Sequence, residues 1–195
     1  MAALGRATSL TSDLRAALRR YKPERRKNQL KPRSRDRLVA VADIDLPGRP
    51  MLVPDTNVYI MFASGKMPDV ARALVERSLL FHCSVCLGEL ATGVANFDPS
   101  TSAWRGVRDH YAALFDAVPA TRLLTPDSQL WIEAGVIAGI LARTQNFQPH
   151  QRKECLNDAL IYLTAAKRGL PVLTANRDEF DLIQQIAPDG QFVHL

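Results

Sequence analysis

From residue 51 onward the chain alternates short apolar runs with segments of helical periodicity, and this alternation limits its folds more than any other feature. The apolar runs, which we interpret as strands, lie at residues 51–55, 79–85, 122–125, 171–175 and 191–195. Successive strands joined through helices run parallel and are covered by helices on both sides. The pattern therefore predicts an α/β fold of three layers, with a mostly parallel central sheet of four to five strands flanked by helices on both faces.

The segments between these runs space their apolar residues as helix faces do. Helices are expected after Asn57, which is placed to cap the first of them, and at residues 68–78, 86–94, 102–118, 127 or 128 to about 145, 151–168 and 178–186. Gly169 and Pro171 follow the segment over residues 151–168, and this combination is typical of a helix end.

Charge is distributed unevenly along the chain. Residues 1–50 hold 13 Lys and Arg against 5 Asp and Glu, a net +8, whereas residues 51–195 hold 12 against 15, a net −3, which together give the +5 of the whole chain. We therefore predict a basic N-terminal extension over residues 1–50 and a globular domain over residues 51–195. The extension is expected to contain a short helix at residues 11–21, a basic arm at residues 22–37 and an edge strand at residues 37–46.

The composition excludes several classes of protein. With 47% hydrophobic and 23% charged residues the chain is typical of a soluble globular protein. No apolar stretch approaches the roughly 18 residues of a membrane span, and no secretory signal is visible at the start. The Arg-rich first 22 residues overlap in composition with mitochondrial presequences, although a cytoplasmic tail is the favoured interpretation. We expect a cytoplasmic protein without membrane contact.

The three cysteines indicate a reducing compartment. Cys83 and Cys86 form a CxxC pair, but no second pair follows to complete a zinc site. A thioredoxin-like pair would lie at a strand-to-helix junction with altered thiol acidity. We favour packing cysteines over a redox or zinc role.

Polar side chains recur near the ends of the predicted strands, where functional groups gather in a parallel sheet. They are Asp55 and Asn57 after the first strand, Glu89 in the helix after the second, Asp158 in an otherwise apolar helix, and Asn176 with Asp178 after the fourth strand. Taken singly, each acid is more often a helix cap or a member of an ion pair. Their shared location in one α/β pattern instead favours a common site.

Several carboxylates directed at one point repel each other, so either some protonate or a cation neutralises them. Oxygen-only ligands favour Mg²⁺ or Mn²⁺, and the lack of a nearby His in the sequence argues against a zinc hydrolase. Such a cation can acidify a water for in-line attack on a phosphodiester. The acids therefore predict a metal-dependent phosphodiesterase.

Three segments, LVPDTNVYI, LGELATGV and NDALIYLTAAKRGLPVLTANRDEF, carry a resemblance to the PIN domain family over residues 51–195. Within that family the chain resembles the VapC-like ribonuclease toxins of bacterial toxin–antitoxin modules. The resemblance implies a PIN-like fold and metal-dependent cleavage of single-stranded or structured RNA.

Carried over by position, the resemblance implies specific roles. The implied catalytic acids, which are also the implied ligands of Mg²⁺ or Mn²⁺, are Asp55, Glu89 and Asp158, and Asp178 joins the catalytic set only as a substitute for a missing fourth acid. Asn57, Thr174 and Asn176 are expected to be polar supports. Asn176 stands where the family often has a fourth acid, so Asp178 or, ranked behind it, Glu179 is expected to supply that charge. One or two metal ions fit this pattern.

The resemblance also implies partners: an RNA substrate, a second copy in a homodimer, and an antitoxin whose C-terminal segment covers the acidic groove. The extension lies outside the resemblance. One hypothesis is that it binds RNA through its cations, which are Arg19, Arg20, Lys22, Arg25, Arg26, Lys27, Lys31 and Arg33. The alternatives are a solvated tail, or a helix that packs Leu10, Leu14 and Leu18 onto the domain or onto a second subunit.

Two other functions compete with a ribonuclease. Asn176 makes a non-catalytic PIN-like module that binds RNA or protein conceivable, although such a module has no need to keep three costly acids together. A phosphatase or nucleotide-binding domain is disfavoured because there is no Gly-rich phosphate loop and no DxD with a downstream Lys.

Overall fold

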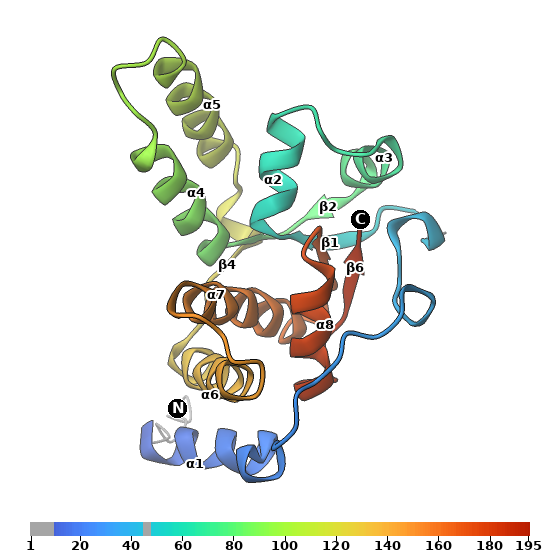
Figure 1. The fold of residues 1–195 in the computed structure, drawn as a ribbon. Coiled ribbons are helices and arrows are strands. Elements are labelled where there is room, and N and C mark those ends of the chain that lie inside the picture. Colours follow the sequence, from blue (N-terminus) through green and yellow to red (C-terminus); the bar gives the residue numbers. More distant parts are fainter. Residues whose placement is uncertain (1–9, 45–47) are drawn as a thin grey trace, which may run out of the picture.

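A parallel sheet lies at the centre of the protein, between helices on both faces (Figure 1). The computed structural model describes residues 10–44 and 48–195. The four strands of the sheet, in the order β2-β1-β5-β6, are β2 (Leu79–Leu80), β1 (Met51–Pro54), β5 (Val172–Thr174) and β6 (Phe192–His194). A second parallel pair joins β3 (His82–Cys83) to β4 (Leu123–Leu124). The predicted α/β fold with a parallel sheet of four strands is confirmed.

The helices account for most of the described chain. They are α1 (Leu10–Tyr21), α2 (Thr56–Ala63), α3 (Asp69–Arg77), α4 (Ser84–Asn96), α5 (Trp104–Asp116), α6 (Ser128–Thr144), α7 (Pro149–Ala166) and α8 (Arg177–Ile186). Short 3₁₀ turns lie at Pro23–Arg25, Arg35–Arg37, Val41–Asp43 and Ala120–Arg122. Figure 1 shows α4 and α5 projecting together as a pair away from the sheet. Within residues 10–44 and 48–195, no helix combines the length and hydropathy that a membrane crossing requires.

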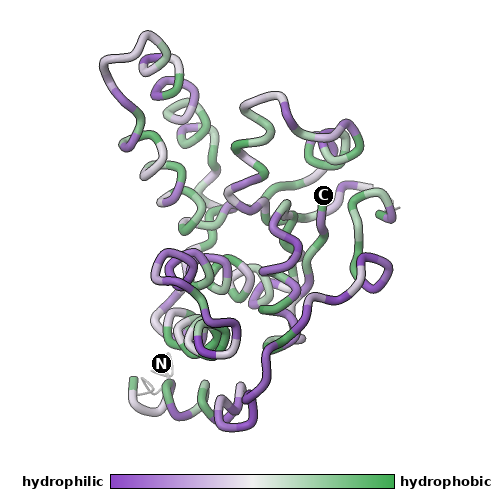
Figure 2. The backbone as a smooth tube through the Cα atoms, in the orientation of Figure 1, coloured by the Kyte–Doolittle hydropathy of each residue, from purple (hydrophilic) through white to green (hydrophobic). Residues whose placement is uncertain are grey.

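Alternation along the strands builds a core on each face of the sheet. Val53, Val172 and Phe192 are aligned across three strands and belong to the larger core, with α6, α7 and α8. Leu173 and Val193 point to the opposite face and join the smaller core with α3. In Figure 2 the strands are coloured as mostly hydrophobic, whereas the segment that follows α1 is coloured as mostly hydrophilic.

The structure corrects three expected elements. Residues 79–85 are not one strand but the short strands β2 and β3, because the chain leaves β1 after Phe81 and pairs with β4 instead. The cap of α2 is Asp55 rather than Asn57, since the Asp55 carboxylate accepts a hydrogen bond from the Thr56 amide. Residues 37–46 form no strand among their described members: 3₁₀ turns interrupt them, and they meet the sheet through one isolated bridge from Ala40 to His194. The part of this prediction at residues 45–47 lies outside the described residues.

Helix α1 packs on α6. Ala17 and Tyr21 are buried there, and the Tyr21 hydroxyl donates a hydrogen bond to buried Glu133. The three leucines that were considered for this contact remain exposed, by 63% for Leu10, 45% for Leu14 and 39% for Leu18. The alternative in which the leucines pack onto the domain is therefore wrong, because the small Ala17 and the polar tip of Tyr21 fit α6 instead, and their packing onto a second subunit stays a prediction.

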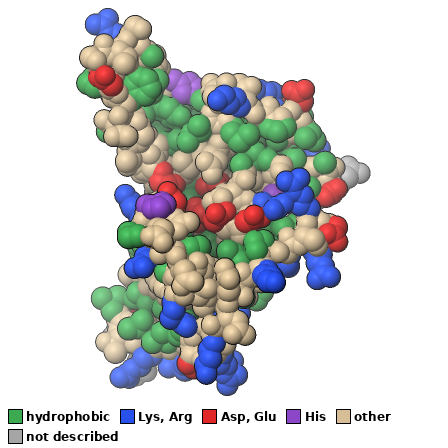
Figure 3. All heavy atoms as spheres, viewed as in Figure 1, with side chains coloured by type: hydrophobic (Ala, Val, Ile, Leu, Met, Phe, Trp, Pro, Cys, Tyr) green, Lys and Arg blue, Asp and Glu red, His purple; other side chains and the backbone are tan. Residues whose placement is uncertain are grey.

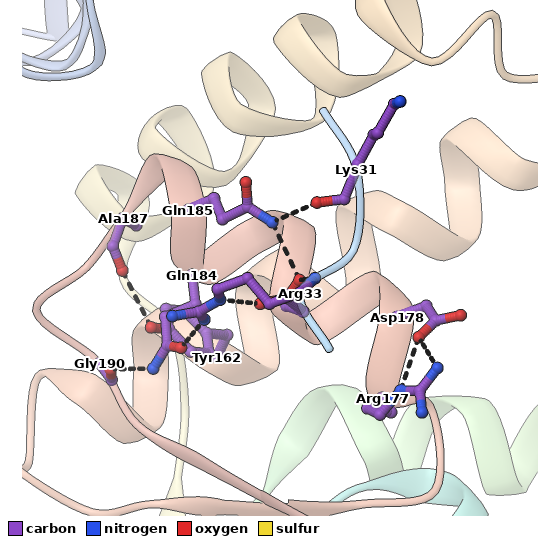
Figure 4. Close-up of polar contacts among 10 residues, drawn as sticks. Lys31, Arg33, Tyr162, Arg177, Asp178, Gln184, Gln185, Ala187 and Gly190 are labelled. Atoms are coloured by element: carbon purple, nitrogen blue, oxygen red, sulfur yellow. Dashed lines mark hydrogen bonds and ion pairs between the residues drawn. The ribbon is translucent and has the colours of Figure 1, made fainter. Parts of the chain in front are cut away.

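The segment after α1 lies along α8 (Figures 1 and 4). The Arg33 guanidinium pairs with the fully buried carboxylate of Asp181 at 2.5 Å, and the Arg33 amide donates to the same carboxylate at 2.6 Å. Gln184 accepts a further hydrogen bond from Arg33, and Gln185 donates to the Lys31 carbonyl at 3.0 Å. The basic arm is thus tied to the helix that follows β5. The division into an extension over residues 1–50 and a domain over residues 51–195 stays a prediction.

The cysteines are packed inside the protein. Cys83 and Cys86 are fully buried free thiols at the junction of β3 and α4, and the Cys86 thiol lies 3.6 Å from the Pro54 carbonyl. Burial raises the pKa of Cys86 well above its ordinary value. A hydrogen bond with Cys86 lowers the pKa of Cys83. The burial of both thiols is that of packing cysteines, whereas their place at a strand-to-helix junction and their altered acidity are those of the redox alternative, so the interpretation as packing cysteines stays a prediction.

Candidate active site

Asp55 lies at the carboxyl end of β1, where its carboxylate is only 2% exposed. One oxygen accepts from the Thr56 amide at 2.7 Å, and the other accepts from the Thr174 hydroxyl at 2.9 Å. Strands β1 and β5 are parallel neighbours, so their ends bring Asp55 and Thr174 together. Asn57 points the same way and donates to Asp55 across 3.4 Å. Asp55 is therefore both a helix cap and a member of the site.

Glu89 reaches the same region from α4. Its Oε1 accepts a hydrogen bond of 2.7 Å from Asn157 on α7, and its Oε2 accepts one from the Thr56 hydroxyl on α2. Sequence reasoning missed Thr56 and Asn157. Each directly adjoins a predicted acid, and that adjacency was the signal available in the sequence.

Asp158 faces the site from the buried side of α7, with 8% of the residue exposed. Its Oδ2 accepts a hydrogen bond of 3.0 Å from the Asn176 amide. The Asn176 backbone amide in turn donates to the Thr174 hydroxyl at 2.9 Å. A chain of hydrogen bonds therefore links Asp158 to Asp55 through Asn176 and Thr174.

The carboxylates influence each other strongly. Burial raises the pKa of Asp55 to about 6, and the charge of Glu89 adds to this shift, while hydrogen bonds from Thr174 and Thr56 oppose it. Burial raises the pKa of Asp158 well above its usual range, and the charges of Asp55, Glu89 and Glu179 raise it further. None of the ion pairs found among the described residues involves Asp55, Glu89 or Asp158. The negative charges of the three acids thus act on one another, and no cationic side chain among the described residues forms an ion pair with them.

The fourth predicted acid has a different environment. Asp178 forms an ion pair of 2.5 Å with its neighbour Arg177 in the first turn of α8 (Figure 4). The adjacent Glu179 is the residue whose charge acts on Asp158, and burial raises its own pKa. The catalytic role of Asp178 stays a prediction. Because its charge acts on Asp158, Glu179 is the better candidate for the fourth acid of the site, although we ranked it behind Asp178 from the sequence.

The donor set fits a hard divalent cation. The hydrogen bonds that hold the three acids in place come from backbone and side-chain amides and from hydroxyl groups. As the side chains stand in residues 10–44 and 48–195, no group of three His, Cys, Asp or Glu could hold a metal ion. Mg²⁺ in proteins usually takes one or two carboxylates together with waters and substrate phosphate oxygens. The three acids therefore suit an ion that they hold in part through water and substrate phosphate oxygens, rather than a closed cage of three direct carboxylate ligands.

Three of the eight extension cations proposed to bind RNA are engaged within the protein. Arg20 pairs with Glu133 and Asp189, Arg33 with Asp181, and Arg26 donates to the Gln185 carbonyl. The other five are exposed on the surface, and these are Arg19, Lys22, Arg25, Lys27 and Lys31. RNA binding by the extension stays a prediction.

On the surface, acidic side chains gather in a hollow across the middle of the face drawn in Figure 3, with basic side chains and a histidine at its rim. Glu89 and Asn157 line a cavity of about 650 Å³ between α4 and α7. A smaller pocket holds Asn176, Arg177, Asp178 and Glu179 together with Arg35 of the extension. Glu89, Asp178 and Glu179 are thus reachable from the surface, whereas Asp55 and Asp158 lie buried behind them.

Comparisons with solved structures show the same fold in other proteins. VapBC2 from Rickettsia felis, solved bound to a DNA fragment from its promoter, matches with a TM-score of 0.53 and 15% identity over 74% of this chain and 98% of that chain. FitAcB from Neisseria gonorrhoeae and VapBC-1 from nontypeable Haemophilus influenzae each match with a TM-score of 0.52 and 20% identity over 74% of this chain and 97% of theirs. At these identities the likeness shows the fold alone.

The family comparison covers the region that carries the acids. The sequence of residues 52–185 matches the PIN domain, and this range includes Asp55, Glu89 and Asp158. No curated protein matches the chain significantly. The range matched is more than half of the 195 residues. The chain belongs to the PIN domain family.

Proposed function

We propose that the protein is an endoribonuclease that depends on Mg²⁺ or Mn²⁺ and cuts RNA phosphodiester bonds. The observation that carries the proposal is the set of three buried or half-buried acids, Asp55, Glu89 and Asp158, held in one field with no cationic side chain paired to them. Keeping such a set charged costs free energy unless a bound cation compensates it. Membership of the PIN domain family supports the same reading.

The side chains divide the work of the reaction between them. Asp55, Asp158 and Glu89 would hold the cation, which supplies an acidified water and neutralises charge on the phosphodiester. Thr174 and Asn176 donate hydrogen bonds that fix the orientation of the two aspartates. Of the three acids, only Glu89 lines the cavity between α4 and α7. A substrate phosphate that enters through this cavity would therefore meet Glu89 first.

The proposed biological role is that of the toxin in a toxin–antitoxin pair, acting as a cytoplasmic homodimer until an antitoxin covers the acidic groove. Support comes from the fold shared with VapBC and FitAcB complexes. Further support comes from α2, where Ile60 is 46% and Phe62 is 39% exposed. Phe62 lines an apolar pocket with Tyr59 and Leu114 that suits a protein contact.

A second candidate is a PIN-like module that binds RNA or protein without cutting it. The observation that favours it is the Asn176 amide, which donates a hydrogen bond to Asp158 where the family often places another acid. In this case the protein would keep a cation-binding cluster and the groove, but it would lack the fourth negative charge that cleavage requires.

An RNA-cleavage assay separates the two candidates. Purified protein is incubated with labelled RNA in Mg²⁺, in Mn²⁺ and in EDTA, beside the variants Asp55→Asn, Asp158→Asn and Glu89→Gln. We expect cleavage with either ion and a loss of about a hundredfold or more in each variant. Asp98→Asn, an exposed acid outside the site, is the matched control and should cleave normally. Cleavage that persists in EDTA and in Asp55→Asn would overturn the mechanism.

A further inference from the structure

A groove runs outward from the acids between two helices and the loop after β4. Its walls are one face of α4, including Gly88 and Glu89, and one face of α7, including Lys153 and Asn157. Its volume is about 650 Å³, and its inner end is the hydrogen bond between Glu89 and Asn157. The groove is therefore continuous with the acidic cluster.

The outer end of this groove carries an exposed aromatic ring. Trp131, in the first turns of α6, lines the groove and is 48% exposed, although its neighbours Leu130 and Ala134 are buried. A large apolar side chain left half in water at a groove that leads to a site is typical of a contact surface for a ligand. Indole rings stack on nucleobases of any sequence.

The two helical walls complement such a ring. His150 and Lys153 are exposed one helical turn apart on α7, where they can meet an anion. On α4 the groove wall has no side chain at Gly88, and a Cβ added there would meet nothing within 4 Å. Because glycine is less favourable than alanine inside a helix and no packing demands it here, Gly88 leaves room for a ligand.

From these observations we propose that the groove seats an unpaired nucleotide of single-stranded RNA beside the cleavage site. The base stacks on Trp131 and lies over the bare helix surface at Gly88, while the adjoining phosphate is held by Lys153. Glu154, also in the groove, repels phosphate and keeps it on the Lys153 side. The inference rests on the proposed function, since the acids at the inner end are those proposed to cut RNA.

The geometry favours RNA over a peptide as occupant. A peptide in this groove would compete with the polar pair of Glu89 and Asn157 at its inner end, whereas RNA brings a phosphate to that end and a base to the outer end. A duplex cannot occupy the groove in this way, because its bases are paired and stacked on each other. Stacking on Trp131 therefore requires a nucleotide that is unpaired beside the cut.

Tryptophan fluorescence tests the seat directly. The chain has two tryptophans, Trp104 on α5 and Trp131, so Trp104→Phe leaves Trp131 as the sole emitter. Short single-stranded RNA of mixed sequence is titrated into this variant in EDTA and, separately, in Ca²⁺. We expect quenching on binding, and little quenching with a duplex of the same sequence. RNA binding that leaves Trp131 emission unchanged would overturn the proposal.

A second test measures the affinity of matched variants for single-stranded RNA. Trp131→Ala should weaken single-stranded RNA binding roughly tenfold or more, and Trp131→Phe should retain most of the affinity. Gly88→Gln should also weaken binding, whereas Gly93→Gln, on the same helix with an equally open Cβ, lies outside the residues that line the groove and should not. Unchanged affinity in both Trp131→Ala and Gly88→Gln, with melting temperatures that show folded protein, would refute the seat.

The failure of this inference is separate from the failure of the proposed function. If wild-type protein cuts RNA but Trp131→Ala cuts it with unchanged KM, the nuclease proposal stands and the seat is wrong. If wild-type protein cuts no RNA yet Trp131 is quenched by single strands, the seat stands and the nuclease proposal is wrong.

Discussion

Asn176 donates a hydrogen bond of 3.0 Å from its side-chain amide to Oδ2 of Asp158. The bond is charge-assisted when Asp158 is ionised, and it lowers the pKa of Asp158 against the stronger effects that raise it. An amide at this position therefore substitutes for part of the charge compensation that a metal ion would give. It makes the cluster less costly to maintain before any ion binds.

Replacing this amide with an acid should change the response to metal. We expect Asn176→Asp to lower the stability of metal-free protein by about 2 kcal/mol, because a hydrogen bond to a charged group is replaced by repulsion. Mg²⁺ should then raise the melting temperature more in the variant than in wild type. Thermal melts with EDTA and with Mg²⁺ measure this, with Asn96→Asp at an exposed position as control. An equal effect of Mg²⁺ on both proteins would contradict the prediction.

The buried Asp55 predicts an unusual pH dependence of stability in metal-free protein. Its folded pKa of about 6 exceeds the ordinary 3.8, so the folded state holds the proton more tightly than the unfolded state does. The stabilising effect is complete below about pH 4 and is lost as the pH rises through about 6, by about 3 kcal/mol in total. Denaturant titrations across this range in EDTA measure it.

Asp55→Asn supplies the control for this pH dependence. Asparagine caps helices as well as aspartate does and can still accept from Thr56, so the fold should persist. The variant should be more stable than wild type at pH 7 in EDTA. Its loss of stability between pH 4 and 6 should be smaller than that of wild type, and the remainder comes from Asp158, whose pKa is also raised. A wild-type protein whose stability rises across that interval would show that Asp55 is not the dominant titrating group.

The extension should contribute strongly to folding through one ion pair. Arg33→Ala leaves the fully buried Asp181 carboxylate without its guanidinium, which should cost about 3 kcal/mol. Arg25→Ala, at an exposed arginine of the same segment, should cost little. Urea denaturation compares the two variants with wild type. Equal stability of Arg33→Ala and Arg25→Ala would show that the buried pair is not needed.

RNA binding by the extension is best tested at three of its exposed cations. Deletion of the whole segment would remove the Arg33 pair and confound folding with binding. Replacing Arg19, Arg25 and Lys27 with Gln should instead reduce the slope of log affinity against log salt by about 2 if all three meet phosphates of a single strand. The measurement is RNA affinity over a range of salt. A slope equal to that of wild type would exclude the RNA-binding role.

The part of the site built by strand ends was predictable from the sequence. Because parallel neighbours end at the same edge, Asp55 after β1 and Thr174 at the end of β5 had to be close, and the structure places them 2.9 Å apart. The approach of Glu89 from α4 is harder to predict, since it depends on the angle at which that helix crosses the sheet. Its partner Asn157 is 68 residues away, and nothing local in either segment encodes the pairing.

The extension was the least predictable part. Its leucines have regular helical spacing, yet α1 buries Ala17 and Tyr21, because the surface of α6 presents Glu133 to a hydroxyl. Arg33 and Asp181 are 148 residues apart in the sequence. The local charge distribution therefore predicted a basic arm but not the ion pair that ties it to α8. The expected strand over residues 37–46 does not form among its described residues. Leu38 and Val41 are buried, but they lie in or beside 3₁₀ turns and not in a strand paired with the sheet.

The bridge between Ala40 and His194 has a consequence for assembly. Strand β6 is the last in the sheet, and the His194 amide donates to the Val39 carbonyl at 3.0 Å on its outer side. An open edge of this kind invites strand addition by another molecule. Here the chain meets that edge with its own backbone at His194. The extension therefore obstructs strand addition at the carboxyl end of β6, where a second sheet would have to displace it.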